Sequence, residues 1–190
     1  MKRMTLFLLG TGVGVLSLAL ILPDNSPLAG KVLARTEETI TLDVAMDSRK
    51  FNYMRGLALS EIVRGDGFIN EGKIFPAGAL LAGNQNNDPN APGTIGTLVI
   101  CGTSTDTLAG HLANPMMPAT FAHQYLLLSN GMLTASGWRS PAGGNDTAVT
   151  GGTRAFSGAS GDLTITRLGT NATGAANLRY TIVLKKQAPK

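Results

Sequence analysis

Cysteine is nearly absent from this 190-residue sequence, which contains only Cys101. A single cysteine cannot form a disulfide within the chain, so the fold must be held together by its hydrophobic core. Cys101 ends the apolar run 98–101, and we interpret it as a small buried hydrophobic side chain.

Charged residues are also scarce, at 15% of the sequence, and they do not form a basic face. In residues 1–34, Lys2, Arg3 and Lys31 outweigh Asp24 by two charges, which leaves +2 of the formal +4 for the rest of the chain. Beyond residue 34, adjacent basic residues occur only as the pairs Arg49–Lys50 and Lys185–Lys186, and neither forms a larger cluster. Nucleic-acid binding needs a concentrated basic surface, so the sequence argues against a nucleic-acid partner.

Familiar catalytic patterns are missing as well. The only histidines are His111 and His123, and no group of His, Cys, Asp or Glu has the spacing of metal ligands. The sequence contains no G-x-S-x-G, no phosphate-binding P-loop and no evident set of nucleophile, base and orienting residue. We therefore expect no metal and no cofactor, and chemistry by templating rather than by hydrolysis.

The first 34 residues differ from the remainder. Lys2 and Arg3 precede the uncharged run 5–22, a pattern typical of a secretory signal peptide or of an uncleaved membrane anchor. We predict a signal or anchor over residues 1–34 and a folded domain over residues 35–190, exported or tethered to a membrane. The glycines between Gly10 and Gly14 follow no strand, so they do not form a dinucleotide-binding loop.

The domain itself reads as all-β. The chain has 24 glycines, most of them in this domain; these and the short alternating segments suit strands joined by tight turns, and Asn130-Gly131 is a strong hairpin signal. We expect no amphipathic helix after the leader, and an exposed loop at 83–93. Short strands at this spacing indicate an all-β sandwich or barrel, and because barrel closure removes strand edges, we favour the barrel. The expected strands are 39–46, 67–75, 79–82, 94–101, 120–128, 132–138, 147–150, 161–167 and 177–184, with 55–63 either strand or turn.

The glycine-rich stretch 147–166, TAVTGGTRAFSGASGDLTIT, raises the question of a phosphate loop. No helix follows the glycines, and no Lys-Ser or Lys-Thr comes after them. We interpret Gly151-Gly152 as a tight bend and Phe156 as an apolar plug at the start of the next strand.

This stretch resembles the VTGGTGxFxGAxG hairpin of the allene oxide cyclase and dirigent barrels. Residues 65–75 are similar to the GD strand of that superfamily. Residues 129–138, SNGMLTASGW, resemble the SDGxxxAxGW hairpin of bacterial spirotetronate cyclases, which are Diels–Alderases of the same superfamily. The three blocks follow in the same order and spacing over roughly residues 37–186.

The resemblance implies an eight-stranded antiparallel allene oxide cyclase-like barrel with a central cavity, here preceded by an N-terminal hydrophobic helix. Known members work without metal or redox cofactor, by restricting the conformers of an apolar substrate. The resemblance therefore suggests a cyclase or isomerase acting on a polyketide-type intermediate. It also leaves room for membrane association through the N-terminal segment and for a homo-oligomer.

Site residues follow from matching strands. Aligning the first strand puts Asp43 at the plant cyclases' carboxylate, where it is either a cavity acid or a solvated surface residue. Ala45 replaces their water-orienting Asn, so allene oxide cyclisation itself is not expected. On the strand 120–128, the cyclase register turns Ala122, Gln124 and Leu126 inward and His123 and Tyr125 outward. Ala122 stands where the Diels–Alderase has an aromatic residue, which implies a wider cavity.

Further candidates come from neighbouring strands. Asn70 and Glu71 face opposite ways, so one of them should point inward, either as a carboxamide for an oxyanion or as a carboxylate base. Phe68 is expected to line the cavity. Trp138 either stacks on a substrate or caps the core. The predicted catalytic residues are Gln124, Asp43 and Asn70, and the predicted substrate-binding residues are Phe68, Ala122, Leu126 and Trp138.

Three functional readings stay open at this point. The first is a cofactor-independent cyclase or isomerase. The second is a non-catalytic, exported dirigent-like barrel that binds or steers an apolar ligand. The third is a secreted barrel whose core is filled by Phe68, Phe75 and Tyr180 and which binds no ligand.

Overall fold

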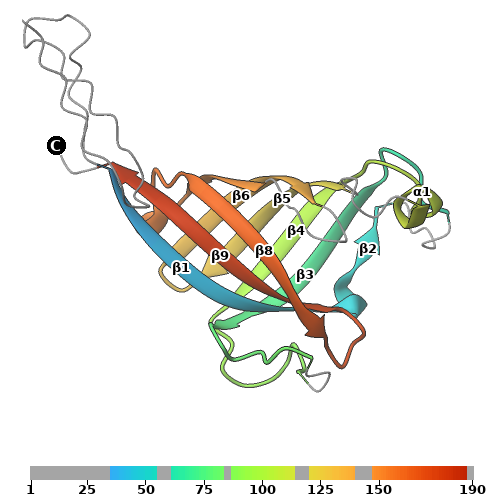
Figure 1. Cartoon of the computed structure of the whole chain (residues 1–190), viewed down its shortest axis with the longest axis horizontal. Helices are drawn as coiled ribbons and strands as arrows, with labels where there is room; N and C mark the ends of the chain where they lie inside the picture. Colours follow the sequence, from blue (N-terminus) through green and yellow to red (C-terminus); the bar gives the residue numbers. More distant parts are fainter. Residues whose placement is uncertain (1–34, 55–60, 84–86, 114–119, 140–146, 188–190) are drawn as a thin grey trace, which may run out of the picture. The chain divides into compact units, whose positions relative to one another are not determined.

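A computed structural model of the chain describes residues 35–54, 61–83, 87–113, 120–139 and 147–187. Strands dominate these ranges, and the helical elements among them are short (Figure 1). The elements are β1 (Arg35–Met46), η1 (Ser48–Lys50), β2 (Asn52–Tyr53), β3 (Gly67–Pro76), β4 (Gly96–Ser104), α1 (Leu108–Ala113), β5 (Thr120–Leu128), β6 (Gly131–Arg139), β7 (Thr147–Gly152), η3 (Arg154–Phe156), β8 (Gly161–Thr170) and β9 (Ala176–Gln187).

The strands form one antiparallel sheet that closes on itself. Its order is β1-β9-β8-β7-β6-β5-β4-β3-β2, and β1 also pairs with β3 over Leu42–Met46 and Gly72–Pro76. This pairing closes eight strands into a ring, to which β2 adds a short strand along the same edge of β3 that pairs with β1. The predicted eight-stranded antiparallel barrel is therefore confirmed, and closure leaves few free edges.

The two ends of the barrel differ. At one end, which we call the loop end, β4 and β6 finish at Ser104 and Arg139, and β5 and β7 begin at Thr120 and Thr147. At the other, the hairpin end, a two-residue turn joins β5 to β6 and the η3 turn joins β7 to β8. In Figure 1 the loop end lies on the side of β2 and α1.

The inner face of the barrel is apolar over most of its length. Alternate residues of each strand point inward and pack as one cluster, because successive side chains of a strand lie on opposite faces. Its fully buried members include Val44, Ile74, Leu98, Ile100, Leu126, Leu133, Ile182 and Leu184.

Phe156 joins this cluster from η3 at the hairpin end. A Cβ atom on Gly152 would lie 2.5 Å from Cβ of Phe156, so only glycine lets this turn approach the strand. The stretch 147–166 is thus a strand, an aromatic plug and a second strand, as its pattern predicted.

A smaller cluster packs against the outer face of the barrel. Ala45, Phe75 and Leu80 are its buried members, and Ala91 and Leu168 pack against them. The connection between β3 and β4 reaches this cluster, where Gly83 N–H donates to the carbonyl of Leu168. The sequence predicted a strand at 79–82 and an exposed loop at 83–93. The first prediction is wrong because the chain turns there to bury Leu80, and the second misses the packing of Ala91.

Asp43 holds this loop against the barrel. Its carboxylate is fully buried and accepts hydrogen bonds from the backbone N–H groups of Gly78 (2.8 Å) and Leu80 (3.0 Å). Arg179, its register partner on β9, donates to both carboxylate oxygens, at 2.8 and 3.2 Å. This carboxylate raises the pKa of Arg179 through its hydrogen bond and its charge.

Three other sequence interpretations concern this part of the chain. Cys101 is half-buried on the outer face of β4, not in the core. The short helix α1 was not foreseen, since its six residues are too few for an amphipathic pattern. The predicted signal or anchor over 1–34 lies outside the described residues, and within the described residues no helix has the length and apolarity to cross a membrane.

Replacing Asp43 with asparagine should destabilise the fold by about 3 kcal/mol, because the Arg179 charge and two N–H groups would lose their anion. This is the lower end for a broken buried pair, since the Arg179 side chain stays 36% exposed and can be hydrated. The same change at Asp162, whose exposed side chain pairs with Lys185 at 2.7 Å, should cost less than about 1 kcal/mol. Urea unfolding measures both, and equal losses would contradict this role of Asp43.

Arg154 stands where the resembling barrels carry glycine, and its φ of 53° lies in the left-handed region. Replacing Arg154 with glycine should raise the free energy of unfolding by about 0.5–1 kcal/mol, because glycine adopts this conformation without a Cβ clash. Arg154→Ala, which keeps a Cβ, should bring no such gain. Thermal unfolding of both variants separates relief of backbone strain from simple loss of the exposed side chain.

Candidate functional site

Small residues line the inside of the barrel near the loop end. Gly102 on β4 pairs with Ala122 on β5, and Ala122 pairs with Gly137 on β6. All three share the inward parity of their strands, so three adjacent strands contribute nothing larger than a methyl group at this level. The next inward residue along this row is Thr147 on β7, a register partner of Gly137.

Unpartnered polar atoms gather around these small residues. Among the described residues, five buried side-chain N or O atoms have no hydrogen-bond partner, and four of them belong to inward-facing residues of β3, β5, β6 and β7. Such an atom costs roughly 1–3 kcal/mol, so folded proteins rarely keep several together without a function. The four atoms are Asn70 Oδ1, Gln124 Nε2, Arg139 Nε and Thr147 Oγ1; we call these residues the polar quartet.

The fifth atom, Asn177 Nδ2, has a different setting. Asn177 faces outward from β9, and its Oδ1 accepts a hydrogen bond from Asn171, whose amide also donates to the backbone carbonyl of Met46. This pair ties the β8–β9 turn to the end of β1. It belongs to the scaffold rather than to the inner site.

Tyr180 holds Gln124 from the opposite wall of the barrel. The hydroxyl of Tyr180, on β9, donates to Gln124 Oε1 at 2.6 Å, and both side chains are fully buried. Because Oε1 is engaged in this way, the free Nε2 is the donor that Gln124 presents to the interior. Burial raises the pKa of Tyr180, so its hydroxyl stays protonated and remains a donor at neutral pH.

Arg139 brings a positive charge toward this pair. It has the inward parity of β6, and its charge acts on Tyr180 in the direction opposite to burial, lowering the pKa of that hydroxyl. The Nε atom of Arg139 is buried and has no hydrogen-bond partner, so this part of the side chain lies inside the barrel at the loop end. Gln124 and Asn70 lie on one level of the wall, separated by Ile100, with which both pair.

Aromatic side chains form the rim beside Asn70. Phe68 is buried on the inner face of β3, stacks with Phe51 at 5.8 Å between ring centroids and meets Tyr53 edge-on at 6.4 Å. Burial and the charge of Asp66 raise the pKa of Tyr53. This rim adds flat apolar surface next to the polar quartet.

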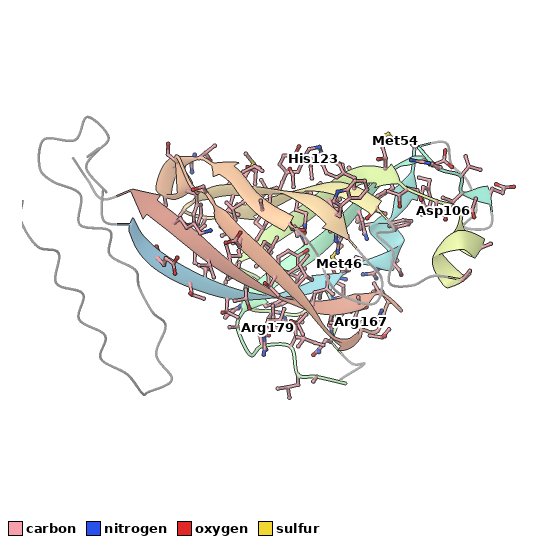
Figure 2. All side chains as sticks on the ribbon, turned by 45° about the horizontal axis from the view of Figure 1, so that its top comes forward. Met46, Met54, Asp106, His123, Arg167 and Arg179 are labelled. Carbon is pink, nitrogen blue, oxygen red and sulfur yellow. The ribbon has the colours of Figure 1, made fainter. Side chains whose placement is uncertain are left out.

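The structure brings together five of the seven predicted site residues. They occupy the inner face of β3 and β5, and the predicted register of β5, with His123 and Tyr125 outside, is confirmed. Figure 2 shows His123 on the outer surface, and its ring lies 2.7 Å from the hydroxyl of Ser136. The roles predicted for these residues stay predictions. The five residues are Phe68, Asn70, Ala122, Gln124 and Leu126.

The other two predicted residues lie elsewhere. Asp43 faces outward, with its carboxylate engaged by the β3–β4 loop and by Arg179, so its predicted catalytic role in the cavity does not fit this position. Trp138 is 45% exposed on the outside of β6, where it meets Phe121 edge-on at 5.2 Å, so it cannot contact a substrate inside. Glu71 and Phe75 also face outward, which leaves Asn70 as the inward member of its pair.

Sequence reasoning missed three residues of the site. Tyr180 was weighed only as core filling, and its contact with Gln124 spans 56 positions of the sequence. Arg139 and Thr147 were not considered. Arg139 could have been found, because it continues the apolar alternation of Leu133, Ala135 and Gly137 and is the one charged residue in that row.

The site contains hydrogen-bond donors and one cation. In the described part of the chain no three His, Cys, Asp or Glu side chains come together as metal ligands would. The inward row of β3 and β5 holds amides and apolar groups, while Asp43 and Glu71 point away. Such a set can bind and orient an oxygen-bearing molecule and can stabilise negative charge on it.

Comparisons with known proteins support the fold. No protein-family model matches the sequence, and no curated protein matches it significantly. Among solved structures, the pterocarpan synthase dirigent protein PsPTS1 is 12% identical, with a TM-score of 0.57 over 81% of this chain and 97% of the other. GePTS1, of the same description, is 12% identical, with a TM-score of 0.55 over 88% and 100%.

A third structure, named pyocyanin demethylase, is 17% identical, with a TM-score of 0.52 over 77% of this chain and 99% of the other. These likenesses extend over nearly the whole length of each neighbour. The chain therefore shares the barrel fold of these structures, and the dirigent-like barrel that the sequence blocks predicted is confirmed as a fold.

The buried Tyr180 hydroxyl predicts how stability depends on pH. An unfolded tyrosine ionises near pH 10.0 and the folded one at higher pH, so the contribution of Tyr180 is complete below that value and is lost as pH rises above it. The loss approaches about 1.4 kcal/mol per pH unit. Urea unfolding between about pH 8 and pH 11 should show a smaller loss for Tyr180→Phe than for the unmodified protein.

The control for this experiment is Tyr125→Phe, the same change on the outer face of β5. This variant keeps Tyr180, so its free energy of unfolding should decrease with pH as steeply as that of the unmodified protein. An identical decrease in the unmodified protein and in Tyr180→Phe would contradict the protonated, buried state of Tyr180.

Proposed function

We propose that this barrel is a cofactor-independent cyclase or isomerase that folds an apolar, polyketide-type intermediate for ring closure at the loop end. The polar quartet is the observation that carries the proposal. Four unpartnered polar atoms lie beside a row of small residues, next to the apolar inner face of the barrel. This arrangement suits a molecule with an apolar body and a few oxygen atoms.

The chemistry available at the quartet supports this reaction class. An intramolecular ring closure needs the reacting ends held close together, which can contribute up to several kcal/mol to the lowering of the barrier. The amide of Gln124, fixed by Tyr180, and the guanidinium of Arg139 are donors that can stabilise an oxygen as negative charge develops on it. Neither step needs a nucleophile or a metal.

The structural neighbours add a measure of support. Their names assign a synthase activity to two of them and a demethylase activity to the third, so barrels of this shape serve more than one reaction. The scaffold therefore does not choose the reaction, and the inward residues must do so.

A second candidate function is a non-catalytic, dirigent-like barrel that binds or steers an apolar ligand. The observation in its favour is that the quartet includes no carboxylate and no nucleophile. The charged start of the sequence and the apolar run after it add a proposed place of action, outside the cell or at a membrane, where apolar intermediates collect.

The test is a turnover assay on the full-length protein. The protein is incubated with linear polyketide-type compounds that carry a conjugated diene and a separate alkene. The products are separated by liquid chromatography, and their masses are measured by mass spectrometry. The expected result is an isomer of unchanged mass, formed about tenfold or more slowly by Gln124→Ala, which loses one fixed donor.

The matched control is Trp138→Phe, on the outside of the neighbouring strand. It should keep the rate of the unmodified protein. Binding of the compounds without any isomer would favour the steering barrel over the cyclase. Equal rates for Gln124→Ala and the unmodified protein would remove the quartet from the reaction.

A further inference from the structure

We infer that the inner site selects organic acids: an apolar molecule bearing a carboxylate, phenolate or enolate oxygen, with that anionic oxygen held between Arg139 and Gln124. The inference rests on the proposed function, since it names the class of molecule that the same site takes. It adds the charge of the ligand, because the apolar inner face of the barrel alone could equally bind neutral molecules.

The hydrogen-bonding balance of the quartet gives the first argument. Gln124 Nε2 and Arg139 Nε can only donate, and the Thr147 hydroxyl can donate as well, whereas Asn70 Oδ1 alone must accept. A complementary ligand is therefore rich in acceptors at its polar end. A carboxylate or an enolate, with acceptor sites and no protons to place, fits this balance better than an amine or an alcohol.

The charge of Arg139 gives the second argument. A guanidinium stays ionised in proteins, and a partly buried one is costly unless an anion compensates it. The ion pairs of the described residues engage Arg49, Arg179 and Lys185, and none of them brings a carboxylate to Arg139. Within the described part of the chain, Arg139 thus has a buried Nε atom and no carboxylate in an ion pair with it.

Geometry gives the third argument. The unpartnered Nε of Arg139 and the unpartnered Nε2 of Gln124 are both buried on the inner face of the adjacent strands β6 and β5, and Tyr180 fixes Gln124 from the opposite wall. The two donors therefore face the same interior. Below that region the wall is entirely apolar at Leu98, Leu126 and Leu133, which pair in register. A ligand held there has its anionic oxygen toward the loop end and its apolar body toward Phe156 and the hairpin end.

A pair of probes with one shape and different charge tests the inference. 2-Naphthoate and 2-naphthamide share the same ring, and only the first is an anion at neutral pH. Isothermal titration calorimetry on the full-length protein should show the acid binding about tenfold or more tightly than the amide, as expected for a charge-assisted hydrogen bond.

Substitutions then assign that preference to Arg139. Arg139→Gln should abolish the preference for 2-naphthoate and leave the affinity for 2-naphthamide nearly unchanged, while Arg139→Lys, which keeps the charge, should retain part of it. Arg167→Gln is the matched control, because Arg167 is exposed near the end of β8, where it donates to the hydroxyl of Thr170, and its removal changes the net charge equally. Figure 2 places Arg167 near Arg179, on the side away from His123.

The outcomes separate this inference from the proposed function. Equal binding of acid and amide, or a preference that survives Arg139→Gln, would overturn the inference and leave a ligand-binding barrel standing. If neither probe bound the unmodified protein, the proposed function would fail and the inference with it. A preference lost equally in Arg167→Gln would show that net charge, and not Arg139, selects the acid.

Discussion

The pairing of β1 with β3 is the contact on which the rest of the molecule depends. Without it the other strands would form an open, twisted sheet with no interior. The seam is tight, since a Cβ atom on Gly72 would lie 2.9 Å from the carbonyl oxygen of Ala45, and glycine permits this approach. Closing the ring gives every strand an inner face, and on that face alternate residues become either core or site.

The two polar centres of the barrel contrast in how completely they are satisfied. Asp43, on the outside of the seam, has four hydrogen bonds from Gly78, Leu80 and Arg179, and this is the pattern of a structural ion pair. In the polar quartet inside the barrel the opposite holds: its donor atoms and its acceptor atom are buried, and none of them has a hydrogen-bond partner. The fully paired network is part of the scaffold, and the unpaired one is the place where we propose that a ligand binds.

The sequence predicted correctly those features that depend on the alternation of inward and outward side chains along a strand. Alternation and hairpin signals predicted the barrel, and the register of residues 120–128 correctly turned Gln124 inward. It failed for Asp43, because the face of β1 depends on how the strand meets β3 and on the loop that later covers it. It also failed at 79–82, where a short apolar run serves a turn as readily as a strand.

Contacts between distant segments could not be predicted from pattern. Tyr180 and Gln124 lie on opposite walls, and the local sequence of neither strand indicates that their side chains form a hydrogen bond. Arg139 was within reach of the alternation argument, but a charge on an apolar row is easily taken for the end of the strand. The inner row of a barrel is best read as a ring across all strands, which requires the register that only the structure supplies.

The hydrogen bond from Tyr180 has one more consequence, which concerns handedness. By holding Oε1, it prevents the Gln124 amide from turning over, so donor and acceptor on that level keep a fixed order: the Gln124 N–H₂ on β5 and the Asn70 oxygen on β3. A flat molecule that met both groups would be held with one particular face toward Ile100 and the other away from it. In the proposed ring closure, new bonds would then form on a single face, and the product would be one mirror image.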